Sequence, residues 1–168
     1  YLTNPLIFLV QVAFGVYTLI VMLRFLFQQM RVDFHNPLSQ FVVKMTSPAL
    51  RPLRKFIPGF AGIDIASLVL AWLVKSAEFI IVILLSGNAI IFAAFLWAIP
   101  ALVSLLFTIF IAALIILAVM SWVPSLQTHP LAWVLRALTE PLLAPIRKYV
   151  PAVSGIDFSV MIAIVALI

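Results

Sequence analysis

Lys75 and Glu78 are the most unusual charged residues of this sequence, because they lie three positions apart near the middle of a long apolar run. At that spacing their side chains share one face of a helix. Charges within a membrane are costly and usually face a bundle interior or a water-filled cavity. We expect a neutralising structural pair. The alternative is a polar element of an ion or solute path, or of a helix–helix contact.

Two carboxylates, Asp64 and Asp157, each follow a Gly-Ile dipeptide and open an apolar run. A carboxylate in this position accepts hydrogen bonds from the free amides of a first helical turn and faces the positive end of the helix dipole. We therefore predict that both residues are helix N-caps. A paired site for a cation or a proton at the membrane mouth is the functional alternative.

Four basic residues form two similar pairs, Arg54-Lys55 and Arg147-Lys148, and each pair stands between two prolines. Cations beside a membrane span fix its orientation at the inner headgroup level. They can also form a docking surface for anionic lipid or for a partner protein. We favour the first interpretation for these four residues, with the docking surface as the functional alternative.

The two histidines, His35 and His129, flank corresponding prolines in two loops. We interpret them as interfacial loop residues, with haem or metal ligation as the less favoured alternative. The sequence has no cysteine, and its residues suggest no paired-carboxylate cleft and no nucleophile–base arrangement. We therefore expect no enzymatic activity, no metal site and no cofactor.

Composition places these residues in a membrane protein. Hydrophobic residues make up 66% of the 168 residues and charged residues 9%, with a mean hydropathy of +1.30. A soluble domain carries roughly a quarter charged residues, because polar groups must cover its surface. The formal net charge of +5 is then expected to orient the chain and to contact anionic headgroups, not to bind nucleic acid directly.

Four apolar runs predict membrane-spanning helices at about residues 6–27, 64–85, 101–123 and 157–168. The first three are long enough to cross a hydrocarbon core of ~30 Å, and the fourth looks cut short. Residues 86–100 are apolar and uncharged but too short to cross, so we expect an interfacial or re-entrant helix at 89–99 that Pro100 ends. The chain begins at Tyr1, so we expect that the true N-terminus is trimmed; no signal peptide is recognised.

The charged residues gather in the loops at 28–62 and 124–155, which hold eight of the ten basic residues. By the positive-inside rule both loops are cytoplasmic and the N-terminus lies outside. Apolar residues recur in each loop at helical spacing, which predicts a helix lying in the interface plane. The stripes are Leu38, Phe41, Val42 and Met45, and Leu131, Val134, Leu135 and Leu138.

Threonine and proline positions divide these loops further. We expect Thr46 and Thr139 to N-cap a second short helix whose first turn tolerates Pro48 or Pro141. Pro52 and Pro145 follow four residues later and should bend or break that helix. Each loop is therefore predicted to be a chain of short helical pieces.

The two loops are copies of one another at a constant offset of 93 residues. Of the 28 residues from 37 to 64, 12 are identical to their counterparts: Pro37, Leu38, Thr46, Pro48, Leu50, Pro52, Arg54, Lys55, Pro58, Gly62, Ile63 and Asp64. The sequence thus predicts an all-α, polytopic helical membrane protein with two parallel repeats, 1–100 and 101–168. Each repeat is a span, an amphipathic broken-helix loop and a second span.

The segments Met120–Pro124, Leu138–Pro151 and Gly155–Ser159 resemble the signature of the YggT (YlmG) family. The first copy resembles the N-terminal half of duplicated members, although it has Ser47 where the second has Glu140. The resemblance implies a multi-pass protein of the bacterial inner membrane. It also implies links to osmotic stress, potassium uptake and cell division, and in plastid relatives to nucleoid distribution and haem attachment. It transfers no catalytic residue.

Together these features favour a non-enzymatic scaffold, assembly factor or stress-response protein of the membrane. Its expected partners are the lipid bilayer, anionic headgroups and membrane or cytoplasmic proteins, and oligomers are possible. The alternatives are a component of potassium or proton transport, motivated by Lys75 and Glu78, and a haem or cytochrome assembly factor, which would need His35 or His129.

Overall fold

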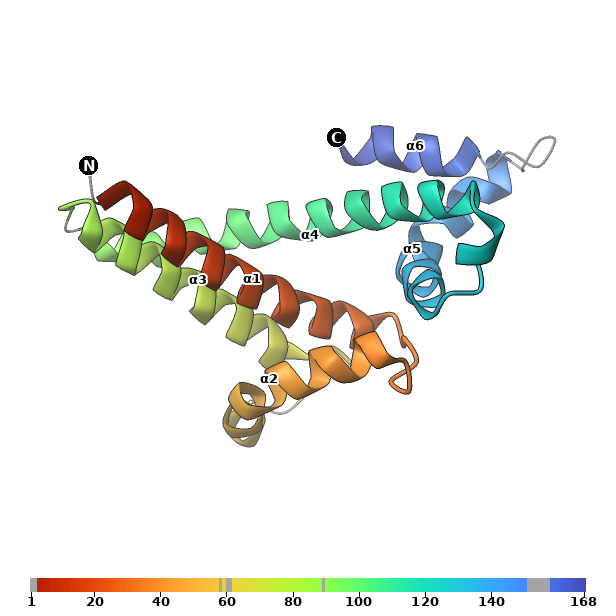
Figure 1. Cartoon of the computed structure of the whole chain (residues 1–168). Coiled ribbons are helices and arrows are strands. Elements are labelled where there is room, and N and C mark those ends of the chain that lie inside the picture. Colours follow the sequence, from red (N-terminus) through yellow and green to blue (C-terminus); the bar gives the residue numbers. More distant parts are fainter. Residues whose placement is uncertain (1–2, 58, 60–61, 89, 151–157) are drawn as a thin grey trace. The chain divides into compact units, whose positions relative to one another are not determined.

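The computed structural model describes residues 3–57, 59, 62–88, 90–150 and 158–168 (Figure 1). Within these ranges the chain forms α-helices joined by short connections. The helices are α1 (Thr3–Gln29), α2 (Pro37–Phe56), α3 (Ile65–Leu85), α4 (Ile91–Ser121), α5 (Pro130–Tyr149) and α6 (Phe158–Leu167), with a 3₁₀ turn at Pro124–Leu126 before α5.

Three of these helices are long and apolar enough to cross a membrane: α1 over Pro5–Gln29, α3 over its full length and α4 over its full length. Their large side chains face outward in many places, as at Phe8 (66% exposed) and Phe92 (74% exposed). Outward apolar groups are expected where lipid replaces water around the helix. The predicted all-helical membrane fold is confirmed.

The chain divides into two compact units. The first comprises Tyr1–Gln29 and Phe41–Leu106, and the second comprises Met30–Gln40 and Phe107–Ile168. Helices α2 and α4 each begin in one unit and end in the other, so neither unit is a continuous stretch of sequence.

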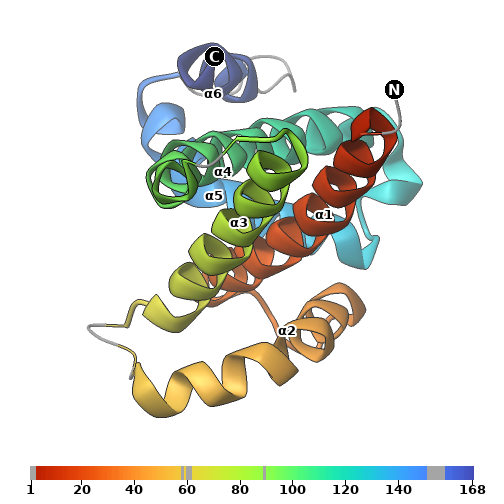
Figure 2. The same ribbon diagram turned by 90° about the vertical axis from the view of Figure 1, so that its left-hand side faces the viewer.

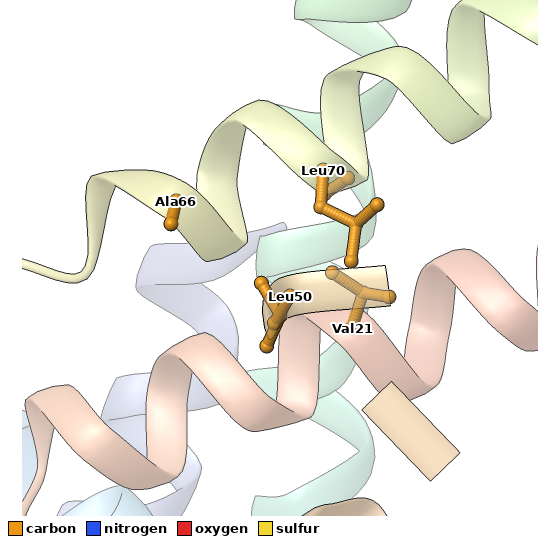
Figure 3. Close-up of a cluster of buried hydrophobic side chains, with 5 residues drawn as sticks. Val21, Leu50, Ala66 and Leu70 are labelled. Atoms are coloured by element: carbon orange, nitrogen blue, oxygen red, sulfur yellow. The ribbon is translucent and has the colours of Figure 1, made fainter. Parts of the chain in front are cut away.

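In the first unit, α1 and α3 lie side by side and run antiparallel (Figures 1 and 2). Their contact contains Val21 from α1 and Ala66, Leu70 and Ala71 from α3, and Leu50 of α2 joins the same cluster (Figure 3). The small Ala66 and Ala71 side chains suit a close approach of helices, as is common between helices in membranes. In the second unit, a smaller cluster joins Leu114 of α4, Leu143 of α5 and Ala163 of α6.

Helices α2 and α5 are longer than the sequence predicted. Each is a 20-residue helix with two internal prolines, and each bound of α5 lies 93 residues after the corresponding bound of α2. Figure 1 shows α2 changing direction along its length, as expected where proline removes a backbone bond. The loops are therefore bent helices and not chains of separate short ones.

The predicted N-caps at Thr46 and Thr139 are wrong, because both residues lie inside these helices. Thr46 Oγ1 donates to the Val42 carbonyl at 2.7 Å, and Thr139 Oγ1 donates to the Leu135 carbonyl at 2.8 Å. A threonine hydroxyl bonded four residues back satisfies itself within the helix and tends to bend it. A threonine before a proline thus marks a bend here, not a helix start.

The predicted helix end at Pro100 is also wrong, because Pro100 lies inside α4, a continuous helix of 31 residues. The predicted boundary between residues 100 and 101 therefore falls within one helix. Pro100 leaves the carbonyl of Leu96, four residues earlier, without its amide donor, and membrane helices tolerate a proline at such a cost. One residue before Leu96, α4 contacts α3: Trp72 of α3 donates from Nε1 to the Phe95 carbonyl at 3.0 Å, and its ring lies 5.5 Å from that of Phe95.

Candidate functional site

Asp64 is the N-cap residue of α3 and the centre of a buried polar cluster in the first unit. Gly62, which has φ of +80°, turns the chain just before it, a conformation that glycine adopts without strain. The Asp64 side chain is 4% exposed, and its Oδ1 accepts from the Ser67 amide at 3.3 Å. Its Oδ2 accepts from the Ser67 hydroxyl at 2.6 Å.

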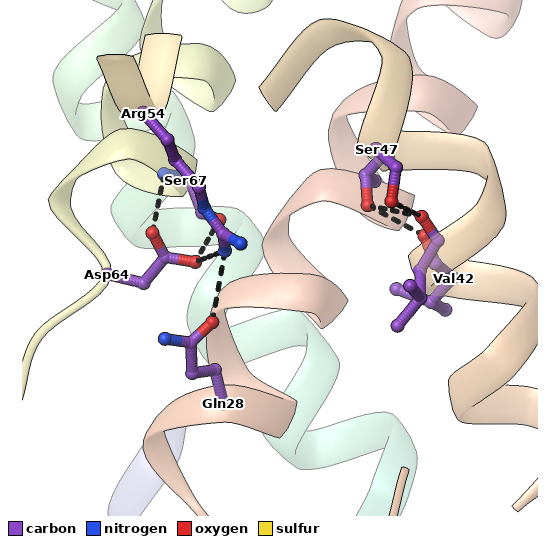
Figure 4. Close-up of polar contacts among 8 residues, drawn as sticks. Gln28, Val42, Ser47, Arg54, Asp64 and Ser67 are labelled. Carbon is purple, nitrogen blue, oxygen red and sulfur yellow. Dashed lines mark hydrogen bonds and ion pairs between the residues drawn. The ribbon is translucent and has the colours of Figure 1, made fainter. Parts of the chain in front are cut away.

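Arg54 supplies the counter-charge from the last turn of α2. One terminal nitrogen lies 2.7 Å from Asp64 Oδ2 and 3.2 Å from Gln28 Oε1 (Figure 4). Because Gln28 lies in the last turn of α1, this guanidinium joins three helices at one end of the α1–α3 pair. Arg54 is therefore a structural residue as well as a candidate docking residue.

Arg24 is a member of this cluster that the sequence interpretation did not single out. It lies one turn before Gln28 in α1, is 9% exposed, and interacts electrostatically with Arg54 and Asp64. The available signal was that Arg24 is the one charged residue of residues 3–29 and shares a helix face with Gln28. Arg24, Arg54 and Asp64 together carry a net positive charge of one.

Lys75 and Glu78 form the intramembrane pair within α3. The Lys75 ammonium lies 2.8 Å from each Glu78 oxygen, with the side chains 18% and 3% exposed. The ammonium also lies 5.1 Å from the Phe79 ring centroid, a cation–π contact. The buried Ser76 hydroxyl beside them has no hydrogen-bond partner among the described residues. Lys75 and Glu78 therefore neutralise each other within a single helix.

The basic pairs differ in what their members contact. Arg147 lies 3.0 Å from Glu140 on α5, much as Arg54 is tied to Asp64. Lys55 and Lys148 are exposed, and neither forms an ion pair within the described part of the chain. The lysines are therefore the freer candidates for lipid or partner contact. Asp157, the second predicted N-cap, lies outside the described residues.

The two histidines have local backbone roles. His35 donates from its amide to Asp33 Oδ1 at 2.9 Å, and its ring nitrogen lies 2.9 Å from the same oxygen. These contacts with His35 hold the pKa of Asp33 below its usual value. His129 Nδ1 accepts from the Leu131 amide at 3.2 Å and so caps α5. Among the described residues, no group of three potential metal ligands converges.

Asn36 is a further residue that the sequence interpretation missed. Its Oδ1 accepts from the Leu38 amide at 3.0 Å, which caps the start of α2. Its Nδ2 donates to the Pro130 carbonyl at 2.8 Å, at the start of α5. Asn36 and His129 occupy corresponding positions 93 residues apart, so each caps its own helix in the same way.

The outward face of α2 carries two adjoining stripes. Phe41 (52% exposed) and Met45 (43% exposed) form an apolar stripe. The exposed Lys44, Arg51 and Lys55 form a basic stripe beside it. The opposite face, which includes Val42 and Leu50, is buried. This is the amphipathic pattern of a helix at a membrane surface.

Comparison with known proteins identifies one family. The model of the family described as CCB3/YggT matches residues 3–85 and again residues 96–168. The two matches begin 93 residues apart, which is the offset of the internal similarity. No solved structure matches the chain.

Several bacterial proteins are similar to the chain over nearly its whole length. An uncharacterized protein of Pseudomonas aeruginosa is 44% identical over 99% of this chain and 86% of the relative. The Escherichia coli K12 protein named YggT is 41% identical over 98% of this chain and 86% of its own length. A protein from the region 3′ of proC in Vibrio alginolyticus is 38% identical over 98% of this chain and 90% of the relative.

Proposed function

The chain belongs to the CCB3/YggT family, and from that premise we propose that it is a non-enzymatic membrane scaffold. It displays α2 and α5 at the cytoplasmic face of the bacterial inner membrane. There the two helices bind anionic lipid headgroups and present a surface to protein partners. The links to osmotic stress and cell division implied by the family resemblance fit a protein that organises others at the membrane.

The outward face of α2 is the observation that carries this proposal. Its apolar stripe, Phe41 and Met45, adjoins its basic stripe, Lys44, Arg51 and Lys55. A helix at the membrane interface inserts its apolar side chains below the lipid headgroups and places its basic side chains among them. Each basic residue near an anionic surface contributes about 1 kcal/mol of attraction. On α5, the exposed Lys148, Trp133 and Tyr149 offer similar groups.

The position of α2 supports insertion at that depth. α1 ends and α3 begins on the same side of the membrane, because the two helices are antiparallel and α2 connects them. The Arg54–Asp64 and Arg54–Gln28 contacts fix α2 to these two helix ends. The outward stripes of α2 are therefore held at the level where a span leaves the hydrocarbon.

Charge distribution supports the cytoplasmic assignment. The loops containing α2 and α5 hold eight of the ten basic residues, and residues 86–100 between α3 and α4 hold none. Two spans, α3 and α4, separate the loops, so both lie on one side of the membrane. The positive-inside rule then makes that side the cytoplasm.

The test removes the charge of exposed basic residues that form no ion pair among the described residues, and it keeps Arg54 and Arg147, which do form ion pairs. The variant carries Lys44→Gln, Arg51→Gln, Lys55→Gln and Lys148→Gln. The control exchanges Lys and Arg at the same four positions and so keeps every charge. Because the sequence has no cysteine, a fluorophore on Met45→Cys reports insertion of α2 in vesicles with or without phosphatidylglycerol.

We expect the neutralised variant to insert its spans normally, to lose the phosphatidylglycerol-dependent blue shift of the label and to fail to restore growth at high osmolarity in a deletion strain. The charge-preserving control should behave as the wild type. Full restoration by the neutralised variant, with an unchanged blue shift, would remove the proposal.

A transport role is the second candidate, because Lys75 and Glu78 form a buried ion pair inside a span. Purified protein in liposomes should then pass potassium or protons, and Glu78→Gln should change the flux. Flux equal to that of empty liposomes would exclude this candidate and leave the scaffold proposal untouched.

A further inference from the structure

The second unit contains a cavity of about 590 Å³ between α4, α5 and α6. Its walls fall into two chemical zones. One zone is apolar and includes Leu117 and Met120 of α4 and Val160 and Ile164 of α6. The other is polar and is supplied mainly by Arg136, Glu140 and Arg147 of α5. A space with these two zones suits a ligand that is apolar at one end and charged at the other.

The polar zone has one positive charge that is not already neutralised. Three charged residues share a face of α5, because two of them follow the first by four and by eleven positions: Arg136, Glu140 and Arg147. Glu140 accepts from Arg147 at 3.0 Å and 3.3 Å, so these two charges offset each other. Within the described part of the chain Arg136 forms no salt bridge, and its side chain is exposed. The zone therefore favours a monoanion.

The cavity borders the end of a membrane-spanning helix. Leu117 and Met120 belong to the last turns of α4, a membrane-spanning helix that ends at Ser121. Trp122, which follows directly, is 83% exposed, and tryptophan is enriched at membrane–water interfaces. A phosphate bound at Arg136 would leave the glycerol and one acyl chain beside the apolar zone.

The corresponding positions of the first unit do not form such a zone. Arg136 and Glu140 correspond to Val43 and Ser47. Ser47 donates to the Val43 carbonyl of its own helix, and Arg54 is engaged by Asp64. The two loops thus differ in charge at the positions that line the cavity. The charged residues that line the cavity are therefore specific to the second copy of the repeat.

We propose that this cavity binds one anionic glycerophospholipid, with its phosphate at Arg136 and an acyl chain against α4 and α6. The proposal deepens the proposed function and rests on it in placing these helix ends at an anionic membrane surface. It differs by assigning a single stoichiometric lipid to a defined site, where the outward faces of α2 and α5 make diffuse contacts with many lipids.

The test titrates the full-length protein with phosphatidylglycerol in mild detergent and follows binding by native mass spectrometry. The wild type should retain one lipid more tightly than the rest. Arg136→Gln should weaken binding of that lipid about tenfold, because it removes a charge-assisted hydrogen bond to the phosphate. Ala118→Phe, which places a ring in the apolar zone, should weaken it similarly. Lys55→Gln and Lys148→Gln serve as exposed-charge controls and should retain it.

Ligand arms separate the lipid from its parts. Phosphatidylcholine should bind the site at least tenfold more weakly, and inorganic phosphate should not displace the lipid. Displacement by phosphate alone, equal affinity for phosphatidylcholine, or retention unchanged in both Arg136→Gln and Ala118→Phe would each overturn the proposal. Thermal midpoints of the variants show whether a loss reflects misfolding, and the exposed Arg136 makes its variant the decisive one.

The two proposals can fail separately. Loss of the single lipid in Arg136→Gln, with the Met45→Cys label still inserting into anionic vesicles, supports the site independently of the surface helices. Retention of the lipid in the variant neutralised at Lys44, Arg51, Lys55 and Lys148 supports the same separation.

Discussion

Arg54 and Asp64 form a 2.7 Å ion pair that joins the last turn of α2 to the N-cap of α3. The carboxylate is almost fully buried, whereas the guanidinium is 41% exposed. The same two side chains therefore cap a helix, neutralise a buried charge and hold an amphipathic helix against two spans. Any surface role of Arg54 is combined with this structural one.

We expect loss of this pair to destabilise the protein in detergent. Asp64→Asn should lower the free energy of unfolding by about 1–3 kcal/mol, because it removes the charge that Arg54 and the Ser67 amide and hydroxyl face. Arg54→Gln should cost somewhat less, and a double-mutant cycle should give a coupling of about 1 kcal/mol or more. Denaturant unfolding followed by tryptophan fluorescence measures this. The neighbouring Lys55→Gln is the control, and strict additivity would contradict the pair.

Removing one member of the Lys75–Glu78 pair should be worse than removing both. Glu78→Gln leaves the largely buried Lys75 ammonium without its carboxylate, which we expect to cost about 3 kcal/mol. The double variant Lys75→Met with Glu78→Leu should unfold close to the wild-type midpoint, because apolar groups suit that depth. Thermal unfolding in detergent distinguishes the two. A double variant as unstable as the single one would argue that the pair holds other helices together.

The length of α4 can be measured directly. Nitroxide labels at the exposed positions Phe92 and Val119 should be separated by about 40 Å, since 27 residues of helix rise about 1.5 Å each. A control pair at Val103 and Val119, both beyond Pro100, should give about 24 Å. Pulsed electron paramagnetic resonance in nanodiscs measures both. A first distance below about 30 Å would mean that the helix breaks at Pro100, as the sequence alone suggested.

Asn36 allows its two hydrogen bonds to be separated. Asn36→Asp keeps an acceptor for the Leu38 amide and loses the donor to the Pro130 carbonyl. We expect it to cost about 1 kcal/mol and to increase amide hydrogen exchange at the start of α5. Asn36→Ala should add faster exchange at the start of α2. His35→Ala is the exposed control, and unchanged exchange at α5 in Asn36→Asp would discount the Pro130 contact.

Three of the four predicted membrane spans correspond to long apolar helices of the structure, because such runs reflect the bilayer and need no knowledge of neighbouring helices. The sequence also placed a cap at Asp64, since capping is a contact within four residues. The pairing of Lys75 with Glu78 followed from helical spacing alone. Each of these features depends on local geometry.

The packing of the helices was needed to show that α4 continues through Pro100 and which charges are neutralised by partners. Pro100 was expected to end a helix, but α4 continues through it and contacts α3 on its N-terminal side, where Trp72 bonds to the Phe95 carbonyl. Arg24 and Gln28 could be recognised as members of the polar cluster only because α2 places Arg54 near both of them. In each case the deciding group comes from a distant part of the chain, because a buried polar atom takes whichever partner the packing of helices brings within hydrogen-bond reach.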